Sequence, residues 1–175
     1  MFRIVISGPE SSGKTDLSVY LTGLLSIPYV PEYAREYVNK LGRPFRFEDV
    51  EHIARIQWDQ FLEYSKGDNP VMIMDTFLVI TKIWFREVFG SVPGWIDQAL
   101  EQADIDLYLL CYPDLKWKAD GIRENPGVRR MELFELYRQE IIRLNFSCAV
   151  IHGKGQQRYT NALNVLYSHF PQLKI

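Results

Sequence analysis

Residues 8–15 read Gly-Pro-Glu-Ser-Ser-Gly-Lys-Thr, and this stretch decides the fold of the chain. The apolar run at 2–6 before it is typical of a buried strand, and leucines recur at helical spacing over 14–25 after it. A glycine-bounded turn between a strand and a helix lets several backbone N–H groups point into one concavity. Because the helix start adds partial positive charge there, the stretch predicts a polyphosphate-binding loop.

The pattern G-x-x-x-x-G-K-[ST] also assigns roles to the side chains of this phosphate loop. Lys14 is expected at the β- and γ-phosphates of ATP, and Thr15 is expected to ligate Mg²⁺. The alternative is a chance match in an ordinary strand-turn-helix, which the placement between strand and helix argues against. The predicted ATP contacts are Gly8, Glu10, Ser11, Ser12, Gly13, Lys14 and Thr15.

The composition of the chain favours one enzyme-sized domain over residues 1–175. The 175 residues are 47% hydrophobic, which suffices for a sizeable core. The net charge of −2 argues against a nucleic-acid partner, which would require a basic face. No leader fits before the loop and no run of 18 apolar residues exists, so we expect a cytoplasmic protein without a membrane partner. A homo-oligomer is left open.

Two cysteines are present, and both lie in apolar runs. Cys111 and Cys148 are therefore expected as free, buried thiols. A disulfide between neighbouring strands is the alternative.

Apolar runs and helical periods alternate along the whole chain, which predicts parallel strands joined by helices. The expected architecture is a three-layer α/β/α sandwich with a five-stranded, mostly parallel sheet, the P-loop NTPase fold. Strands are expected at 2–6, 27–30, 71–74, 107–111 and 147–151. Helices are expected at 14–25, 32–41, 47–64, 77–89, 93–103, 132–144 and 159–170.

Asp75 ends the apolar run 71–74, the most strand-like segment of the chain. A carboxylate there can hold magnesium or receive a substrate hydroxyl, and the alternative is a cap on the following helix. Thr76 follows it, where hydrolytic motors carry a glutamate. GTPase and ABC-type signatures are also absent, which leaves the small-molecule kinases.

A kinase that acts on an alcohol needs a carboxylate near the hydroxyl. Glu32 and Asp75 are the two candidates. The alternative reading of Glu32 is an acidic residue in the first turn of a helix, paired with Arg35 three residues on.

Residues 114–130 are polar, follow a predicted strand and carry three arginines and two glycines. Such a segment suits a lid that excludes water, with Arg123 and Arg130 stabilising charge on the transferred phosphoryl group. A solvated surface loop is the alternative, with its arginines paired to Asp114, Asp120 and Glu124.

Together these motifs resemble the ribosylnicotinamide kinase domain of NadR-type proteins, within the P-loop nucleoside kinases. The resemblance spans nearly the whole chain. It rests on the loop 8–15, on Glu-Tyr-Ala-Arg-Glu-Tyr-Val at 32–38, on Met-Asp-Thr at 74–76, and on Trp-Lys-Ala-Asp-Gly-Ile-Arg at 117–123 followed by Arg130.

The resemblance implies phosphorylation of the ribose 5′-hydroxyl of nicotinamide riboside by ATP, which gives nicotinamide mononucleotide. It implies lid roles for Arg123 and Arg130 and places Arg158 near the adenine. The substrate residues that follow from it are Glu32, Tyr33, Arg35, Asp75 and Trp84.

Two features depart from the family pattern. Full-length members carry a nucleotidyltransferase domain before the kinase, whereas nothing precedes the loop here, so neither adenylyl transfer nor repression is expected. Relatives also often carry a tryptophan where this chain has Pro31. The candidates for stacking on the base are then Tyr29, Tyr33, Trp84 and Trp117, and core packing is the alternative for each.

Two rival functions follow from the same motifs. One is a kinase for another nucleoside or small alcohol. The other is a regulatory nucleotide-binding protein without acceptor-dependent turnover.

The lid assignment predicts different effects for two substitutions. Arg123→Ala should lower turnover far more than ATP affinity, because its charge is needed only on the transferred group. Lys14→Ala should abolish phosphate transfer. Steady-state kinetics with separate titration of ATP measure both effects, and unchanged turnover in Arg123→Ala would remove this residue from the mechanism.

Overall fold

The structure is a computed structural model that describes residues 1–119 and 125–173. Its strands are β1 (Phe2–Ser7), β2 (Tyr29–Val30), β3 (Val71–Asp75), β4 (Leu107–Cys111) and β5 (Cys148–Ile151). Its α-helices are α1 (Lys14–Leu25), α2 (Tyr33–Lys40), α3 (Phe47–Tyr64), α4 (Leu78–Phe89), α5 (Gly94–Gln102), α6 (Val128–Arg143) and α7 (Gln156–His169). A 3-10 turn, η1 (Pro171–Leu173), follows α7.

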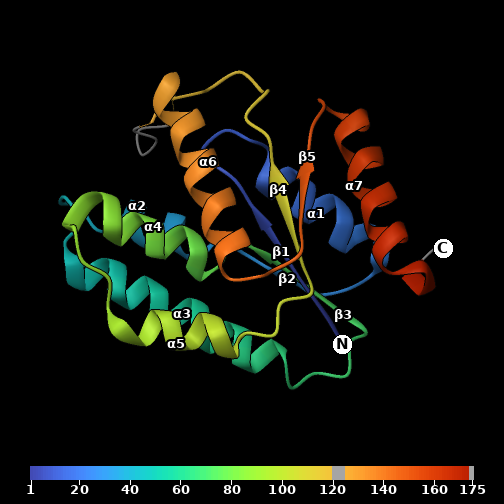
Figure 1. The fold of residues 1–175 in the computed structure, drawn as a ribbon, viewed down its shortest axis with the longest axis horizontal. Helices are drawn as coiled ribbons and strands as arrows, with labels where there is room; N and C mark the ends of the chain where they lie inside the picture. Colours follow the sequence, from blue (N-terminus) through green and yellow to red (C-terminus); the bar gives the residue numbers. More distant parts are fainter. Residues whose placement is uncertain (120–124, 174–175) are drawn as a thin grey trace.

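The five strands form one sheet in the order β2-β3-β1-β4-β5, and all four pairings are parallel. Figure 1 shows α1 and α7 on one face of the sheet and α3 to α6 on the other. The predicted three-layer α/β fold and its five-stranded sheet are therefore confirmed.

Alternation along the strands builds a separate core on each face. In β3, Met72 and Met74 pack with α3, α4, α5 and α6. Val71 and Ile73 point the other way and pack against Leu17 of α1 and the inner face of α7. Every residue of β3 and β4 is buried, as expected for central strands of a parallel sheet covered on both faces.

Several element boundaries differ from those expected from the sequence. The second strand is limited to Tyr29–Val30, and α7 begins three residues earlier than predicted. Helix α6 begins at Val128, so the last three residues of the proposed lid 114–130 are helical. The pattern of apolar residues did not predict this first turn, because the residue that points inward there is an arginine. Arg130 is buried although it is charged.

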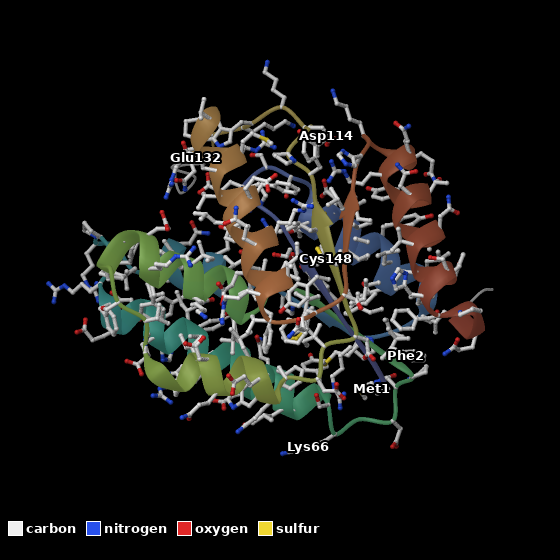
Figure 2. The ribbon with its side chains drawn as sticks, viewed as in Figure 1. Met1, Phe2, Lys66, Asp114, Glu132 and Cys148 are labelled. Carbon is white, nitrogen blue, oxygen red and sulfur yellow. The ribbon has the colours of Figure 1, made fainter. Side chains whose placement is uncertain are left out.

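The carboxyl ends of the strands meet at one end of the molecule. Figure 2 shows Asp114, shortly after β4, at this end and Phe2, at the start of β1, at the other. The register pairs Ile6 of β1 with Asp75 of β3. Loops that follow neighbouring strands are therefore brought together there, which is where ligands bind in open α/β sheets.

Cys111 and Cys148 are free thiols, as predicted, but only Cys111 is fully buried and Cys148 is partly exposed. They lie on neighbouring strands but out of register, since Cys148 pairs with Tyr108 and Cys111 with Ile151. Burial raises the pKa of each thiol to about 11, so both stay protonated near neutrality.

Across residues 1–119 and 125–173, no helix has the length and apolarity to cross a bilayer.

A buried ionic network joins α4, α5 and α6. The Lys82 ammonium donates to Glu140 at 2.7 Å and also to Asp97, and Arg143 donates to Glu140 at 2.7 Å. Burial alone would raise the pKa of Glu140, but hydrogen bonds from Arg143 and Lys82 outweigh this effect and hold it below its ordinary value. The network ties α4, α5 and α6 to one another.

Removing one partner of this network should destabilise the protein. Lys82→Met is expected to lower the free energy of unfolding by about 3 kcal/mol, because Glu140 stays buried with one cation fewer. Urea denaturation followed by circular dichroism measures the change.

The matched control replaces both buried charges, as Lys82→Met combined with Glu140→Leu. It should recover most of the lost stability, because apolar side chains can substitute for a buried ion pair. Wild-type stability in Lys82→Met alone would contradict the role given to the network.

Candidate active site

The phosphate loop curls between β1 and α1 through left-handed backbone conformations at Ser11 (φ 54°) and Gly13 (φ 77°). Gly8 must be glycine, because a Cβ there would lie 2.7 Å from the Cys111 carbonyl oxygen. Inside the curl, the Pro9 carbonyl accepts hydrogen bonds from Ser12 Oγ (2.8 Å) and Lys14 Nζ (3.1 Å). The predicted loop conformation is therefore present.

Asp75 lies directly beside the start of α1. Its Oδ2 accepts hydrogen bonds from Thr15 Oγ1 (2.6 Å) and from the Tyr29 hydroxyl (3.1 Å). Burial, together with the Asp75 carboxylate, raises the pKa of Tyr29 well above its usual value, so this phenol remains a donor. The two predicted magnesium ligands, Thr15 and Asp75, are thus in contact.

These residues fit a magnesium site. Asp75 Oδ1 is buried and has no hydrogen-bond partner among the described residues, which leaves an oxygen for a cation. The described residues contain no cluster of three or more His, Cys, Asp and Glu that could cage a metal by themselves. Magnesium does not require one, since it binds through one or two protein oxygens together with phosphates and waters.

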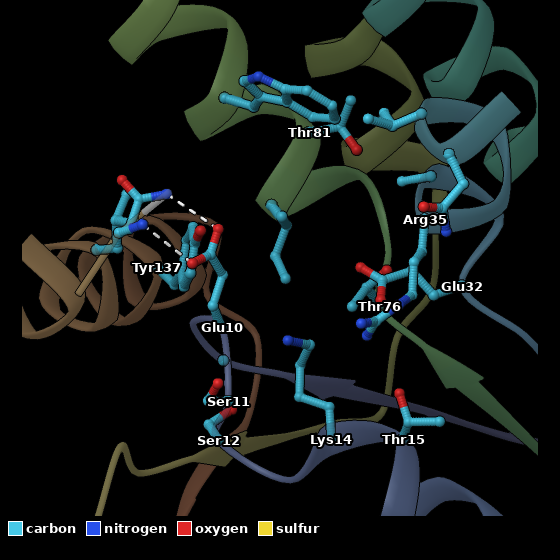
Figure 3. Close-up of a pocket in the computed structure, with 18 of the residues that line it drawn as sticks. Glu10, Ser11, Ser12, Lys14, Thr15, Glu32, Arg35, Thr76, Thr81 and Tyr137 are labelled. Carbon is cyan, nitrogen blue, oxygen red and sulfur yellow. Dashed lines mark hydrogen bonds between the residues drawn. The ribbon is translucent and has the colours of Figure 1, made fainter. Parts of the chain in front are cut away.

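A cleft of about 1100 Å³ opens in front of the loop. Its floor includes Gly8, Glu10 and Lys14, and its opposite wall includes Glu32 and Arg35. Figure 3 shows the Lys14 side chain pointing into the space between Glu10 and Glu32. The structure therefore brings the two predicted groups of residues, the phosphate loop and the first turn of α2, to one cavity.

Local sequence explains why Glu32 and Arg35 face this cleft. Glu32 occupies the N-cap position of α2, two residues after the end of β2, whose neighbour in the sheet is β3, and Arg35 lies one turn further along α2. Ala34 and Val38 of the same helix also line the cleft, so one side of α2 faces it.

The aromatic candidates separate into two groups. Trp84 and Tyr29 line the cleft, whereas Tyr33 and Trp117 do not. Tyr33 instead lines a shallow surface hollow on α2, and its hydroxyl lies 3.1 Å from His52 Nε2. Trp84 packs edge-on against Phe45, with 4.8 Å between the ring centroids, and both rings face the cleft.

The described parts of the 114–130 segment lie against the phosphate loop. The Glu10 carboxylate accepts hydrogen bonds from the Asn125 backbone (3.0 Å), the Asn125 side chain (3.1 Å) and Trp117 Nε1 (3.4 Å). Two of these contacts are drawn in Figure 3. Lys118 N donates to Ser11 Oγ at 3.1 Å. Glu10 and Ser11 therefore hold this segment beside the loop.

The arginines assigned from the sequence occupy different places. Arg130 is 6% exposed and Arg158 is 2% exposed; both contact the loop backbone, and neither lines the cleft. The expected place of Arg158 near an adenine is thus not evident in the geometry. Arg123 lies outside the described residues.

The cleft also contains an ion pair that the sequence did not predict. Arg129 of α6 donates to Glu87 of α4 at 2.8 Å, and both residues line the cavity. The Arg129 guanidinium, whose hydrogen bond outweighs the effect of burial, lowers the pKa of Glu87. No local signal identifies this pair, because the two residues are 42 positions apart.

The parallel sheet in the order β2-β3-β1-β4-β5 and the phosphate loop 8–15 between β1 and α1 define a P-loop domain. The chain matches the family model described as an AAA domain over residues 3–158, and it belongs to that family.

Known proteins agree with this placement. The chain is 29% identical to the trifunctional NAD biosynthesis/regulator protein NadR of Salmonella typhimurium and to that of Escherichia coli, over 69% of its length and 30% of theirs. The predicted resemblance to NadR-type proteins is confirmed. The chain spans less than a third of the length of these relatives.

Solved structures share the fold. A NadR protein in complex with NR superposes with a TM-score of 0.82 at 19% identity, covering 96% of this chain and 50% of that one. A deoxyadenosine kinase from M. mycoides gives a TM-score of 0.65 at 14% identity, covering 95% and 100%.

The geometry at Asp75 predicts how nucleotide binding depends on magnesium. Asp75→Asn should raise the Mg²⁺ concentration for half-maximal nucleotide binding by roughly tenfold, because a neutral amide oxygen is a weaker ligand for a hard cation. Titration of Mg²⁺ at a fixed concentration of a fluorescent ADP analogue measures this.

Asp59→Asn, at an exposed position on α3, is the matched control and should bind as the wild type does. An unchanged Mg²⁺ midpoint in Asp75→Asn would exclude Asp75 as a ligand.

Proposed function

We propose that this protein is a kinase that uses ATP and Mg²⁺ to phosphorylate the ribose 5′-hydroxyl of nicotinamide riboside, giving nicotinamide mononucleotide. One observation carries the proposal. Lys14 and Thr15, which suit a triphosphate, and Glu32 and Arg35, which suit an alcohol substrate, line the same cleft.

The donor half of the site is the loop with Lys14, Thr15 and Asp75. The inward N–H groups of the loop and the start of α1 bind the β- and γ-phosphates, and Lys14 adds a full positive charge to them. Thr15 Oγ1 and the buried Asp75 carboxylate hold the magnesium ion. When bound, this ion neutralises negative charge on the phosphate oxygens.

The acceptor half of the site is the wall formed by α2 and α4. Glu32 lines the cleft, whereas Asp75 does not line it and is held by Thr15, so we assign the acceptor hydroxyl to Glu32. Glu32 accepts the proton of the 5′-hydroxyl. At the same time the ribose 5′-oxygen bonds to the γ-phosphorus, and the bond between the γ-phosphorus and the β–γ bridging oxygen breaks, which releases ADP. Arg35, one helical turn away, orients the ribose.

Trp84 is the residue that we assign to the base. It is partly exposed in the cleft, and its partner Phe45 fixes its ring edge-on. The nicotinamide ring of the riboside carries a positive charge, and a cation over an indole face is attracted by the ring quadrupole. Trp84 thereby takes the place of the aromatic residue that this chain lacks at Pro31.

The comparisons support the proposal at the level of class. The relatives of known role are named for NAD biosynthesis, and the NadR structure was solved in complex with NR, which we take as nicotinamide riboside. The acceptor remains the part that experiment must decide, because kinases for deoxyadenosine and thymidylate share the same fold.

A panel of acceptors tests the proposal. With ATP and Mg²⁺, nicotinamide riboside should be converted to its 5′-monophosphate at a kcat/KM at least about a hundredfold above adenosine, cytidine and thymidine, because a site that fits one acceptor discriminates by several kcal/mol. Product formation is followed by chromatography and mass spectrometry.

Lys14→Ala is the matched control and should lose transfer to every acceptor. Activity on another nucleoside without activity on nicotinamide riboside would replace the proposed substrate. Nucleotide binding without turnover on any acceptor would favour a regulatory protein.

A further inference from the structure

Three successive carbonyl groups of the phosphate loop accept hydrogen bonds from two buried arginines. Arg130 of α6 donates to the Glu10 carbonyl from Nε and to the Ser11 carbonyl from Nη2, each at 2.8 Å. Arg158 of α7 donates to the Ser12 carbonyl at 2.5 Å. The two arginines come from helices on opposite faces of the sheet, so they reach the loop from two sides.

We propose that Arg130 and Arg158 are positioning residues that orient the peptide groups of the phosphate loop and thereby set its affinity for the α- and β-phosphates of the nucleotide. This assignment rests on the nucleotide-binding half of the proposed function and is independent of the acceptor. It differs from the role expected from the sequence, in which Arg130 acts on the transferred phosphoryl group.

The C=O and N–H bonds of one peptide unit point in opposite directions. Carbonyls held toward the arginines at Glu10, Ser11 and Ser12 therefore turn the N–H groups of Ser11, Ser12 and Gly13 the other way, toward the cleft that these residues line. Those N–H groups are the anion-binding elements of such a loop.

The loop needs external partners to keep this shape. Ser11 adopts a left-handed conformation with φ 54°, which a residue with a Cβ rarely occupies. The hydrogen bonds from Arg130 fix the peptide units on both sides of it. A guanidinium can make both because its donors form a planar fork, which a lysine ammonium lacks.

Other contacts hold the arginines in place. Arg130 Nη1 donates to the Leu115 carbonyl at 2.8 Å, which ties the segment after β4 to the loop. Arg158 donates to the Gly153 carbonyl at 2.8 Å and the Tyr112 carbonyl at 3.1 Å and pairs with Asp114. Each guanidinium group therefore donates to several backbone carbonyls, and its positive charge polarises the loop amides from behind.

The test compares MgADP binding among conservative variants. Arg130→Lys and Arg158→Lys keep the positive charge but lose the planar set of guanidinium N–H donors. Each should weaken MgADP binding about tenfold or more in isothermal titration calorimetry. ADP has no γ-phosphate. An arginine that acted only on the transferred group would therefore leave MgADP affinity unchanged.

Arg138→Lys is the matched control, because Arg138 lies on α6, is exposed and pairs only with Glu135 among the described residues. It should bind MgADP as the wild type does. Thermal unfolding of each variant without nucleotide separates positioning from stability. Should Arg158→Lys fail to fold, Arg130→Lys and Arg130→Gln decide the matter.

Two results would overturn the inference. One is wild-type affinity for MgADP in a folded Arg130→Lys. The other is a lowered melting temperature with MgADP affinity retained, which would make the contact structural only. A wild-type protein that does not bind MgADP would instead refute nucleotide binding, whereas a failed acceptor panel would leave this inference intact.

Discussion

The direction of the peptide groups in residues 8–13 is the constraint on which the rest of the site depends. A phosphate loop binds anions through N–H groups that must converge before the ligand arrives, since reorienting them during binding would cost free energy. In this chain the convergence is imposed partly from outside the loop. The Pro9 carbonyl accepts hydrogen bonds from Ser12 and Lys14 of the loop itself, and the next three carbonyls accept them from Arg130 and Arg158 of the distant helices α6 and α7.

The register of the parallel sheet is sufficient to place Asp75 and Glu32 near the phosphate loop. Because Ile6 pairs with Asp75 in the register of β1 and β3, the aspartate that ends β3 emerges beside the loop that follows β1. The hydrogen bond between Thr15 and Asp75 follows from that register. The position of Glu32 also follows from the sheet. Strand β2 pairs with β3 on the side away from β1, and Glu32 lies at the start of α2, shortly after β2 ends.

Sequence reasoning succeeded where the determinants are local. The bounds of α1 were predicted to the residue, because the loop motif fixes where it begins and leucine spacing marks its extent. Lys14, Thr15 and Asp75 were named from motif and strand patterns in the same way; the structure brings them to the phosphate loop, and their roles in binding stay predictions. Arg130 was assigned to the transferred phosphoryl group because of its charge, but its side chain is buried beneath the loop and does not line the cleft.

Contacts between distant segments explain what the sequence could not provide. The Tyr29–Asp75 hydrogen bond and the Arg129–Glu87 pair join elements 46 and 42 positions apart, and nothing near either residue marks its partner. Thr76 is a related case. It adopts φ 71° directly after β3, an unusual conformation for a β-branched residue, and lines the cleft. Such strain costs about 1–3 kcal/mol and tends to occur at functional sites.

The arrangement also explains how a chain with a net charge of −2 can present a site for a polyphosphate. Affinity for an anion depends on the local field, not on the total charge. Lys14 faces the cleft directly, while Arg130 and Arg158 act through the amide dipoles that they align. The carboxylates of Asp114 and Glu87 pair with Arg158 and Arg129, respectively. Positively charged side chains are thus gathered around the loop, although the chain as a whole carries a net charge of −2.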